Sequence, residues 1–157
     1  MLRTILFTTA ILAAAPAVGA SPAHFLRDAI QGNYSEATLG RYIRSHGATA
    51  QVRNFGAMLN RDHSNGLVQA QAVARREHLA IRASLKPEAR AELRKLRYLR
   101  GTRFDREVRR YMIHDHREDI AMFREQARTG DRRTAAFARA TLPVLQRHLA
   151  MAEAIRR

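Results

Sequence analysis

The chain has 157 residues, of which 28 are Lys or Arg, 14 are Asp or Glu, and none is cysteine or tryptophan. That length fits one domain of ordinary size and argues against two. The missing cysteines exclude disulfides, thiolate catalysis, iron–sulfur clusters and every zinc site that uses cysteine ligands. A hydrophobic content of 46% is enough for a packed core and argues against a disordered chain.

The first twenty residues have the pattern of a secretory signal peptide. Arg3 supplies a positive charge, an uncharged and mostly apolar run covers residues 5–15, and small residues precede a cleavage position after Ala20. The apolar run is shorter than the roughly 20 residues that a membrane span needs, so an uncleaved anchor is the weaker alternative. We expect a signal peptide over residues 1–20, and one exported domain over 21–157 in the periplasm or outer envelope of a bacterium.

The formal net charge of +14 favours an anionic partner. Basic residues gather in a loose band between Arg90 and Arg110, without the interleaved aromatic side chains that stack on bases. An exported protein also rarely meets chromosomal DNA. We therefore expect an anionic envelope surface rather than nucleic acid as a partner, with a merely solvated basic face as the alternative. We expect no transmembrane segment in residues 21–157.

The sequence beyond residue 20 has a helical pattern, and its first half, up to residue 76, predicts two long helices. Alanine is abundant, β-branched residues are sparse, and apolar residues recur at three- and four-residue steps. A first helix is expected from about Ser35 to His46, ended by Gly47, with a turn or two over residues 22–30 before it. A second helix is expected from about Thr49 to residue 76.

The second half predicts a short helix and two more long ones. Pro87 suits the first turn of the short helix, and Gly101 is expected to stop it. Thr102 is expected to cap the next helix, with Asp105 completing a capping box, and Gly130 to end it. Asp131 is expected to cap the last helix.

These elements predict an all-α fold. Four amphipathic helices with mostly short links close most economically as an antiparallel four-helix bundle. The extra short helix falls in the link between helices two and three, where a ferritin-like bundle has its long crossover. We therefore expect a ferritin-like antiparallel four-helix bundle.

Polar residues occupy positions on three helices where core residues are expected. At about 100° per residue, two helices each bring an Asp-His pair to or beside the apolar face, and the last helix brings a histidine to the middle of its apolar face. Buried carboxylates and imidazoles need partners. The candidate metal ligands are His63, His116, His148, Asp62, Asp115 and Asp119.

Two hypotheses account for this polar layer. Imidazole and carboxylate ligands suit zinc, iron, manganese or copper, and bundle interiors are a common place for such sites. Each Asp would then bind the ion or orient a neighbouring histidine, and Glu36 could contribute from the first helix. Alternatively, the layer is free of metal and fixes the register of the helices through hydrogen bonds. No Glu-x-x-His sequence of the di-iron type is present, and no catalytic residue is predicted.

Three ordered segments resemble the domain-of-unknown-function 4142 family, a ferritin-like group of bacterial envelope proteins. They are FGAMLNRDHSN at 55–65; Phe104-Asp105 with YMIHDH at 111–116 and Met122-Phe123; and Leu142-Pro143 with His148-Leu149. The resemblance covers roughly residues 25–155. It implies a ferritin-like four-helix bundle of the envelope and no established activity. The residues that match the family's polar positions are Asp62, His63, Asp105, Asp115, His116 and His148.

Together these features favour an exported helical-bundle protein without catalytic activity. Its interior His/Asp cluster would bind a transition-metal ion, or the protein would serve in protection against envelope stress. The alternative is a structural or interaction module, in which a metal-free polar layer sets register and an Arg-rich surface binds anionic envelope components.

Overall fold

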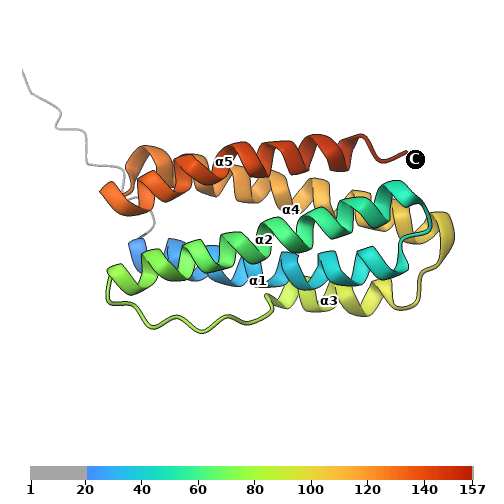
Figure 1. Ribbon diagram of the computed structural model, residues 1–157, viewed down its shortest axis with the longest axis horizontal. Helices are drawn as coiled ribbons and strands as arrows, with labels where there is room; N and C mark the ends of the chain where they lie inside the picture. The colour runs from blue at the N-terminus through green and yellow to red at the C-terminus, as the bar shows by residue number, and fades with distance from the viewer. Residues whose placement is uncertain (1–20, 157) are drawn as a thin grey trace, which may run out of the picture.

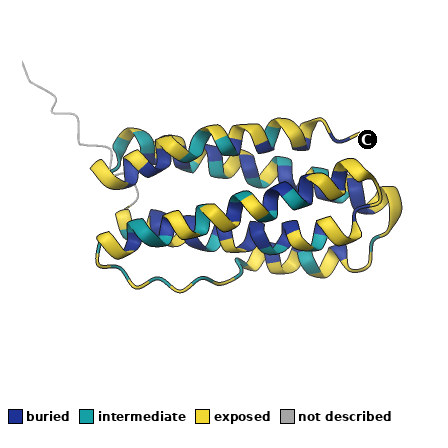
Figure 2. Cartoon of the chain, viewed as in Figure 1, coloured by how far each residue is buried: buried dark blue, intermediate teal, exposed yellow. Residues whose placement is uncertain are grey.

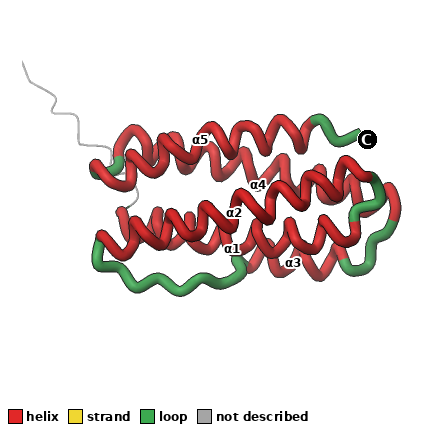
Figure 3. The backbone as a smooth tube through the Cα atoms, in the orientation of Figure 1, coloured by secondary structure: helices red, strands yellow, loops and turns green. Residues whose placement is uncertain are grey.

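The computed structural model describes residues 21–156, and every regular element in that range is a helix (Figures 1 and 3). The prediction of an all-α fold is therefore confirmed for the described residues. The predicted signal peptide over residues 1–20 lies outside them. No helix of the described part is long and apolar enough to cross a membrane. The helices are α1 (Pro22–His46), α2 (Ala50–Arg76), α3 (Pro87–Leu96), α4 (Gly101–Thr129) and α5 (Arg132–Glu153).

The first helix is longer than the sequence suggested. We expected it to begin near Ser35, but α1 is continuous from Pro22. Ser21 caps it by accepting a hydrogen bond from the backbone N–H of His24 (3.3 Å), and Pro22 occupies the first turn. Gly32 and Asn33 are poor helix formers, yet they lie inside α1 because the buried residues around them pack the helix against the core.

The long helices form two antiparallel hairpins that lie side by side (Figure 1). One hairpin is α1 with α2, and the other is α4 with α5. The link over residues 77–100, which contains α3, returns the chain to the opposite end of the molecule beside α1. As a result, α2 and α4 run in the same direction.

The core consists of two apolar clusters, one toward each end of the helices. Figure 2 shows that buried residues occur along the length of the helices. One cluster is centred on Phe55 and Phe104, and the other on Phe25 and Phe123. Every long helix contributes to both clusters. The middle turns of the four helices therefore form a layer between the two clusters, called the middle layer below. The buried polar side chains of that layer include Asn33, Glu36, His63, His116 and His148.

The two helices of the first hairpin touch through glycine. A Cβ atom added to Gly40 would lie 2.8 Å from the Gly56 carbonyl oxygen, and one added to Gly56 would lie 2.8 Å from the Gly40 carbonyl oxygen. A larger residue at either position would therefore push the two backbones apart. This close approach brings the α1 side chains of the middle layer near those of α2.

The capping role predicted for Asp105 is wrong. α4 begins at Gly101 with no side-chain cap, whereas Asp105 accepts hydrogen bonds from the start of α2. Its donors are the backbone N–H groups of Ala48 (2.9 Å) and Thr49 (3.0 Å) and the Thr49 hydroxyl (2.8 Å). Asp105 thus ties the α1–α2 turn to α4. The predicted cap Asp131 for α5 is confirmed, and Thr49 caps α2 by accepting a hydrogen bond from the backbone N–H of Val52.

Candidate metal centre

Three histidine rings from three helices converge in the middle layer. His63 comes from α2, His116 from α4 and His148 from α5, and each is at most 4% exposed. The Nδ1 atom of His148 lies 3.2 Å from Nε2 of His63 and 3.3 Å from Nε2 of His116. The ring centroids are 5.1 to 5.7 Å apart. The three rings therefore face one shared, buried space.

Contacts on the far side of two rings decide which nitrogen carries the proton. The Nε2 atom of His148 lies 3.0 Å from Oδ2 of Asp62, and an ionised carboxylate only accepts hydrogen bonds. The Nδ1 atom of His116 lies 3.1 Å from the Met112 carbonyl oxygen, which also only accepts. In the neutral rings, the inward nitrogens of His148 and His116 are therefore left with a lone pair.

The third ring is fixed by an asparagine. The Nδ1 atom of His63 lies 3.1 Å from Oδ1 of Asn33, whose amide nitrogen donates to the Ala29 carbonyl oxygen (2.8 Å). That donation identifies the Asn33 oxygen as the atom that faces His63, so His63 Nδ1 is the donor. The inward Nε2 atom of His63 then also carries a lone pair.

Burial keeps all three rings neutral. It is the largest cause that lowers the pKa of His63 well below its usual value, followed by the neighbouring His116 and His148. Burial lowers the pKa of His116 to about 4, although Asp115 opposes the change. Burial also lowers the pKa of His148, against the opposing effect of Asp62. Neutral imidazole is the form that binds a metal ion.

The geometry of the three inward nitrogens fits a metal ion. Nitrogen ligands at roughly 2.0–2.1 Å from a zinc-like ion lie about 3.3 Å apart at tetrahedral angles. The two nitrogen separations of 3.2 and 3.3 Å match that spacing, and all three ligand atoms lie within 4.8 Å of one another. Outward partners that hold each ring by its other nitrogen are the usual support of metal-binding histidines.

Glu36 brings a carboxylate from α1 to the same layer. The residue is 1% exposed, and neither of its carboxylate oxygens has a hydrogen-bond partner among the described residues. Its Oε2 atom lies 3.9 Å from Nε2 of His63. The pKa of Glu36 is raised well above its usual value, first by burial and then by the Asp115 carboxylate. Such a group is costly unless it gains a proton or a cation.

The two aspartates of α4 take different places. Asp115 forms a second group with Glu36 and His116, whose ligand atoms lie within 4.8 Å of one another. Asp119 has its Oδ1 atom 3.9 Å from Nζ of Lys86. Burial, followed by Asp115, raises the pKa of Asp119 to about 7. Although burial alone would lower the pKa of Lys86, Asp119 and Asp115 raise it.

The six residues that the sequence suggested for a metal site therefore fall into separate roles. The three histidines surround one space, and Asp62 supports His148 from outside it. Asp115 borders that space beside Glu36, whereas Asp119 faces Lys86 and belongs to neither group of possible ligands. Hydrogen bonds from Arg61 and His148 lower the pKa of Asp62, although its partial burial is the largest single effect and acts in the opposite direction.

Asn33 was missed by sequence analysis, although it fixes the proton of His63. Asparagine is unfavourable inside a helix, and its presence within α1 is the one feature of the sequence that pointed to a special role for this position. Its contact also depends on Gly66 of α2, because a Cβ atom there would lie 2.2 Å from Asn33 Oδ1. Neither residue is of a type that binds metal, so the spacing of ligand residues could not find them.

A hollow of about 290 Å³ between α2 and α5 reaches the edge of the histidine site. Asp62 and His63 line its inner part, and Arg147 lies across it with Nη2 3.5 Å from Oδ2 of Asp62. The outward side of the site is therefore close to solvent on this face of the molecule, while the inward nitrogens stay buried.

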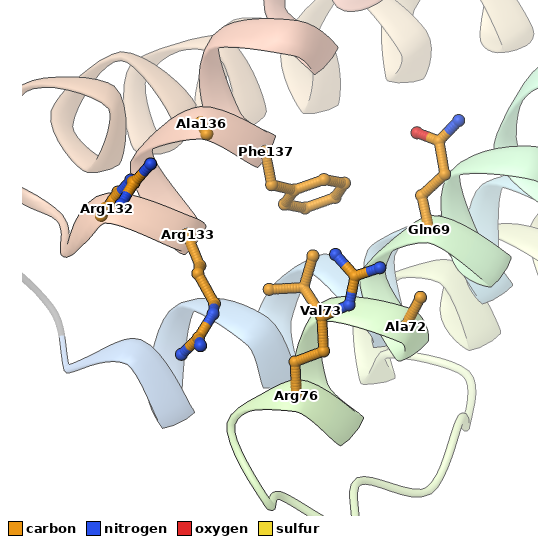
Figure 4. Close-up of a pocket in the computed structure, with 8 residues that line it drawn as sticks. All are labelled: Gln69, Ala72, Val73, Arg76, Arg132, Arg133, Ala136 and Phe137. Carbon is orange, nitrogen blue, oxygen red and sulfur yellow. The ribbon is translucent and has the colours of Figure 1, made fainter.

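A larger hollow of about 450 Å³ lies near one end of the same two helices (Figure 4). Phe137 of α5 and Val73 of α2 supply apolar side chains to it. Three arginines border it, and Arg133 is paired with Glu77 at 3.0 Å. The bordering arginines are Arg76, Arg132 and Arg133.

Comparison with known proteins assigns the chain to a family without assigning it an activity. A family model described as "Domain of unknown function (DUF4142)" matches residues 8–155, which include every residue of the histidine site. The chain matches no curated protein and no solved structure.

Proposed function

Because the chain belongs to the DUF4142 family, whose function is unknown, we propose its function from the site itself: it binds one divalent transition-metal ion through His63, His116 and His148. The observation that carries this proposal is the convergence of three lone pairs. With each outer nitrogen held by an acceptor, the inner nitrogen of His148 lies 3.2 Å from that of His63 and 3.3 Å from that of His116, without a proton between them. A bound cation converts that repulsion into coordination.

The proposed setting is an exported, ferritin-like bundle of the bacterial envelope. Two antiparallel hairpins joined by a long returning link support the ferritin-like part of the proposal. The composition of residues 1–20 supports export. A buried ion suits binding and sequestration, and sequestration of a reactive metal ion is one route to protection against envelope stress.

Metal titration of the purified protein tests the proposal. Metal-free protein is titrated with Mn²⁺, Fe²⁺, Co²⁺, Ni²⁺ or Zn²⁺ by calorimetry, and its melting temperature is recorded with and without each ion. We expect one ion per chain and a higher melting temperature, since an ion at 100 times its Kd adds about 2.7 kcal/mol to stability. A melting temperature unchanged by every ion would reject metal binding.

A pair of histidine variants locates the ion. His148→Ala should abolish the metal-induced rise in melting temperature, because His148 Nδ1 is the atom closest to both other rings. His114→Ala is the matched control, since His114 is exposed on α4 and its ring contacts Glu118. We expect His114→Ala to bind metal like the wild type. Equal binding by both variants would place the ion elsewhere.

A second function is binding to an anionic envelope surface. It is favoured by the arginine-lined hollow where α2 ends and α5 begins. There, Arg76 and Arg132 form no ion pair among the described residues, and Phe137 and Val73 offer an apolar floor for an acyl chain (Figure 4). Vesicles that contain an anionic phospholipid should bind the wild type in low salt and release it as salt rises. Arg76→Ala/Arg132→Ala should weaken this binding, whereas His148→Ala should not.

A further inference from the structure

We infer that Glu36 and Asp115 complete the histidine site, so that one divalent ion is bound by three nitrogens and two carboxylates. This inference rests on the proposed metal binding and extends it to the ligand set and the class of ion. The juxtaposition that supports it is the second group of possible ligands, Glu36, Asp115 and His116, which overlaps the three histidines at His116.

The overlap at His116 makes the two groups one site. His116 Nδ1–H donates a hydrogen bond to the Met112 carbonyl oxygen, so the single available lone pair of the ring is on Nε2. A lone pair of this kind binds one ion. The same Nε2 atom lies 3.3 Å from Nδ1 of His148 and so belongs to the histidine group. An ion bound there would draw in Glu36 and Asp115, whose ligand atoms lie within 4.8 Å of a ring nitrogen of His116.

Glu36 lies at this site beside the Asp115 carboxylate, and it has no donor to pair with among the described residues. Both of its oxygens are fully buried and have no hydrogen-bond partner among the described residues, while Oε2 is 3.9 Å from the inward nitrogen of His63. An isolated buried carboxylate costs several kcal/mol unless it is paired, protonated or bound to a metal. Of these three possibilities, a cation bound among the three imidazole nitrogens also gives the lone pairs of the histidines a partner.

The charges of the layer match a divalent ion. Three neutral imidazoles contribute no charge, and the carboxylates of Glu36 and Asp115 would contribute two negative charges when they bind the ion. Lys86 offsets Asp119, which belongs to neither group of possible ligands. A divalent cation therefore leaves the layer neutral, whereas a monovalent one leaves an uncompensated carboxylate. Mixed imidazole and carboxylate ligands also select against Cu⁺, which prefers sulfur.

The test compares carboxylate variants with a buried carboxylate elsewhere. Glu36→Gln and Asp115→Asn keep the size of each side chain but remove the charge. Glu92→Gln is the matched control, because Glu92 is also buried, also has an oxygen without a partner, and contacts Arg110 instead of the histidines. Circular dichroism of the metal-free proteins verifies that each variant folds.

Cobalt is the probe, because its visible absorption is strong when four ligands surround it and weak when five or six do. The wild type should bind one Co²⁺ with a weak band. Glu36→Gln and Asp115→Asn should each raise Kd by roughly 100-fold or more, since even the loss of an outer partner costs 10- to 100-fold. Glu92→Gln should leave Kd and spectrum unchanged.

Two results overturn the inference in different ways. If Glu36→Gln and Asp115→Asn bind Co²⁺ like the wild type while His148→Ala does not, the carboxylates are not ligands and the three-histidine site stands. If the wild type binds neither Co²⁺ nor any other ion tested, metal binding itself fails and the ligand set fails with it.

Discussion

His148 Nε2 lies 3.0 Å from Asp62 Oδ2, and this contact determines that the opposite nitrogen of the ring faces the other two histidines without a proton. Arg61 Nε donates to Oδ1 of the same carboxylate at 2.8 Å, and Arg147 Nη2 lies 3.5 Å from Oδ2. These cations stabilise the ionised form of Asp62. The aspartate would therefore act on a bound ion through His148, as a positioning residue.

Asp62→Asn should weaken metal binding by roughly 10- to 100-fold without unfolding the protein. An amide nitrogen facing His148 would donate to Nε2 and move the ring proton to Nδ1, the atom that must bind the ion. Calorimetric titration with Zn²⁺ measures the change in Kd. The control is Asp28→Asn, which alters another His–Asp pair (His24 Nδ1 to Asp28 Oδ2, 3.2 Å) on the exposed side of α1. Equal Kd values for the two variants would contradict the role of Asp62.

Gly66→Ala should weaken metal binding through Asn33. The new Cβ atom would lie 2.2 Å from Asn33 Oδ1, so Asn33 must move and His63 loses the acceptor for its outer proton. We expect a loss of about 1–3 kcal/mol in stability from the overlap, against a gain of up to about 1 kcal/mol in helix propensity. Chemical denaturation and metal titration measure the two effects.

Gly32→Ala is the control for this substitution. Its Cβ atom would come no closer than 3.4 Å to Lys86 Nζ, at the end of a flexible side chain. We expect it to be neutral or stabilising. The double variant Gly66→Ala/Asn33→Ala removes the overlap, so it should recover stability without recovering affinity. If Gly66→Ala binds metal like the wild type, Asn33 does not position His63.

The inward histidines could be predicted because helical periodicity is a local property of the sequence. Counting 100° per residue places His63, His116 and His148 on apolar faces, and four amphipathic helices bring such faces together. The proton positions could not be predicted in this way. They depend on Asn33 and Asp62, which contact rings from other helices and differ from His63 and His148 by 30 and 86 positions in the chain.

The ends of the helices show the same division between local and distant causes. Ser21, Thr49 and Asp131 cap the helices that directly follow them, and of these three caps the sequence predicted Asp131. Asp105 fits a capping box by spacing alone, yet its carboxylate accepts from residues 56 and 57 positions away. When a carboxylate could accept either from its own helix or from a distant part of the chain, the local sequence pattern does not show which donors it binds.

Asp105→Ala should destabilise the protein more than the loss of an ordinary helix cap. It would leave the N–H groups of Ala48 and Thr49 and the Thr49 hydroxyl without their acceptor, at a cost of about 2–4 kcal/mol in total. Asp131→Ala, which removes the cap of α5, should cost about 1 kcal/mol. Urea denaturation of both variants measures the difference. A smaller loss for Asp105→Ala than for Asp131→Ala would show that Asp105 does not secure the α1–α2 turn.

Glu92→Gln should stabilise the protein above pH 7 and have little effect near pH 4. Burial, followed by the neighbouring Glu107, raises the pKa of Glu92 to about 7, compared with about 4.3 for an unperturbed glutamate. Between these values the folded protein holds a proton that the unfolded chain releases, so this group lowers stability as pH rises through that range. Glutamine mimics the protonated acid and has no charge to lose.

The expected gain for Glu92→Gln above pH 7 is about 1–3 kcal/mol, because one pKa unit corresponds to about 1.4 kcal/mol and Arg110 offsets part of the cost. Urea denaturation of wild type and variant at pH 4.5 and pH 8 measures it. The buried histidines titrate alike in both proteins, so their contribution cancels in the difference. Glu118→Gln on the exposed face of α4 is the control and should show no such dependence. A difference between wild type and Glu92→Gln that is the same at both pH values would mean that Glu92 is ionised in the folded protein at pH 4.5, as an exposed glutamate is.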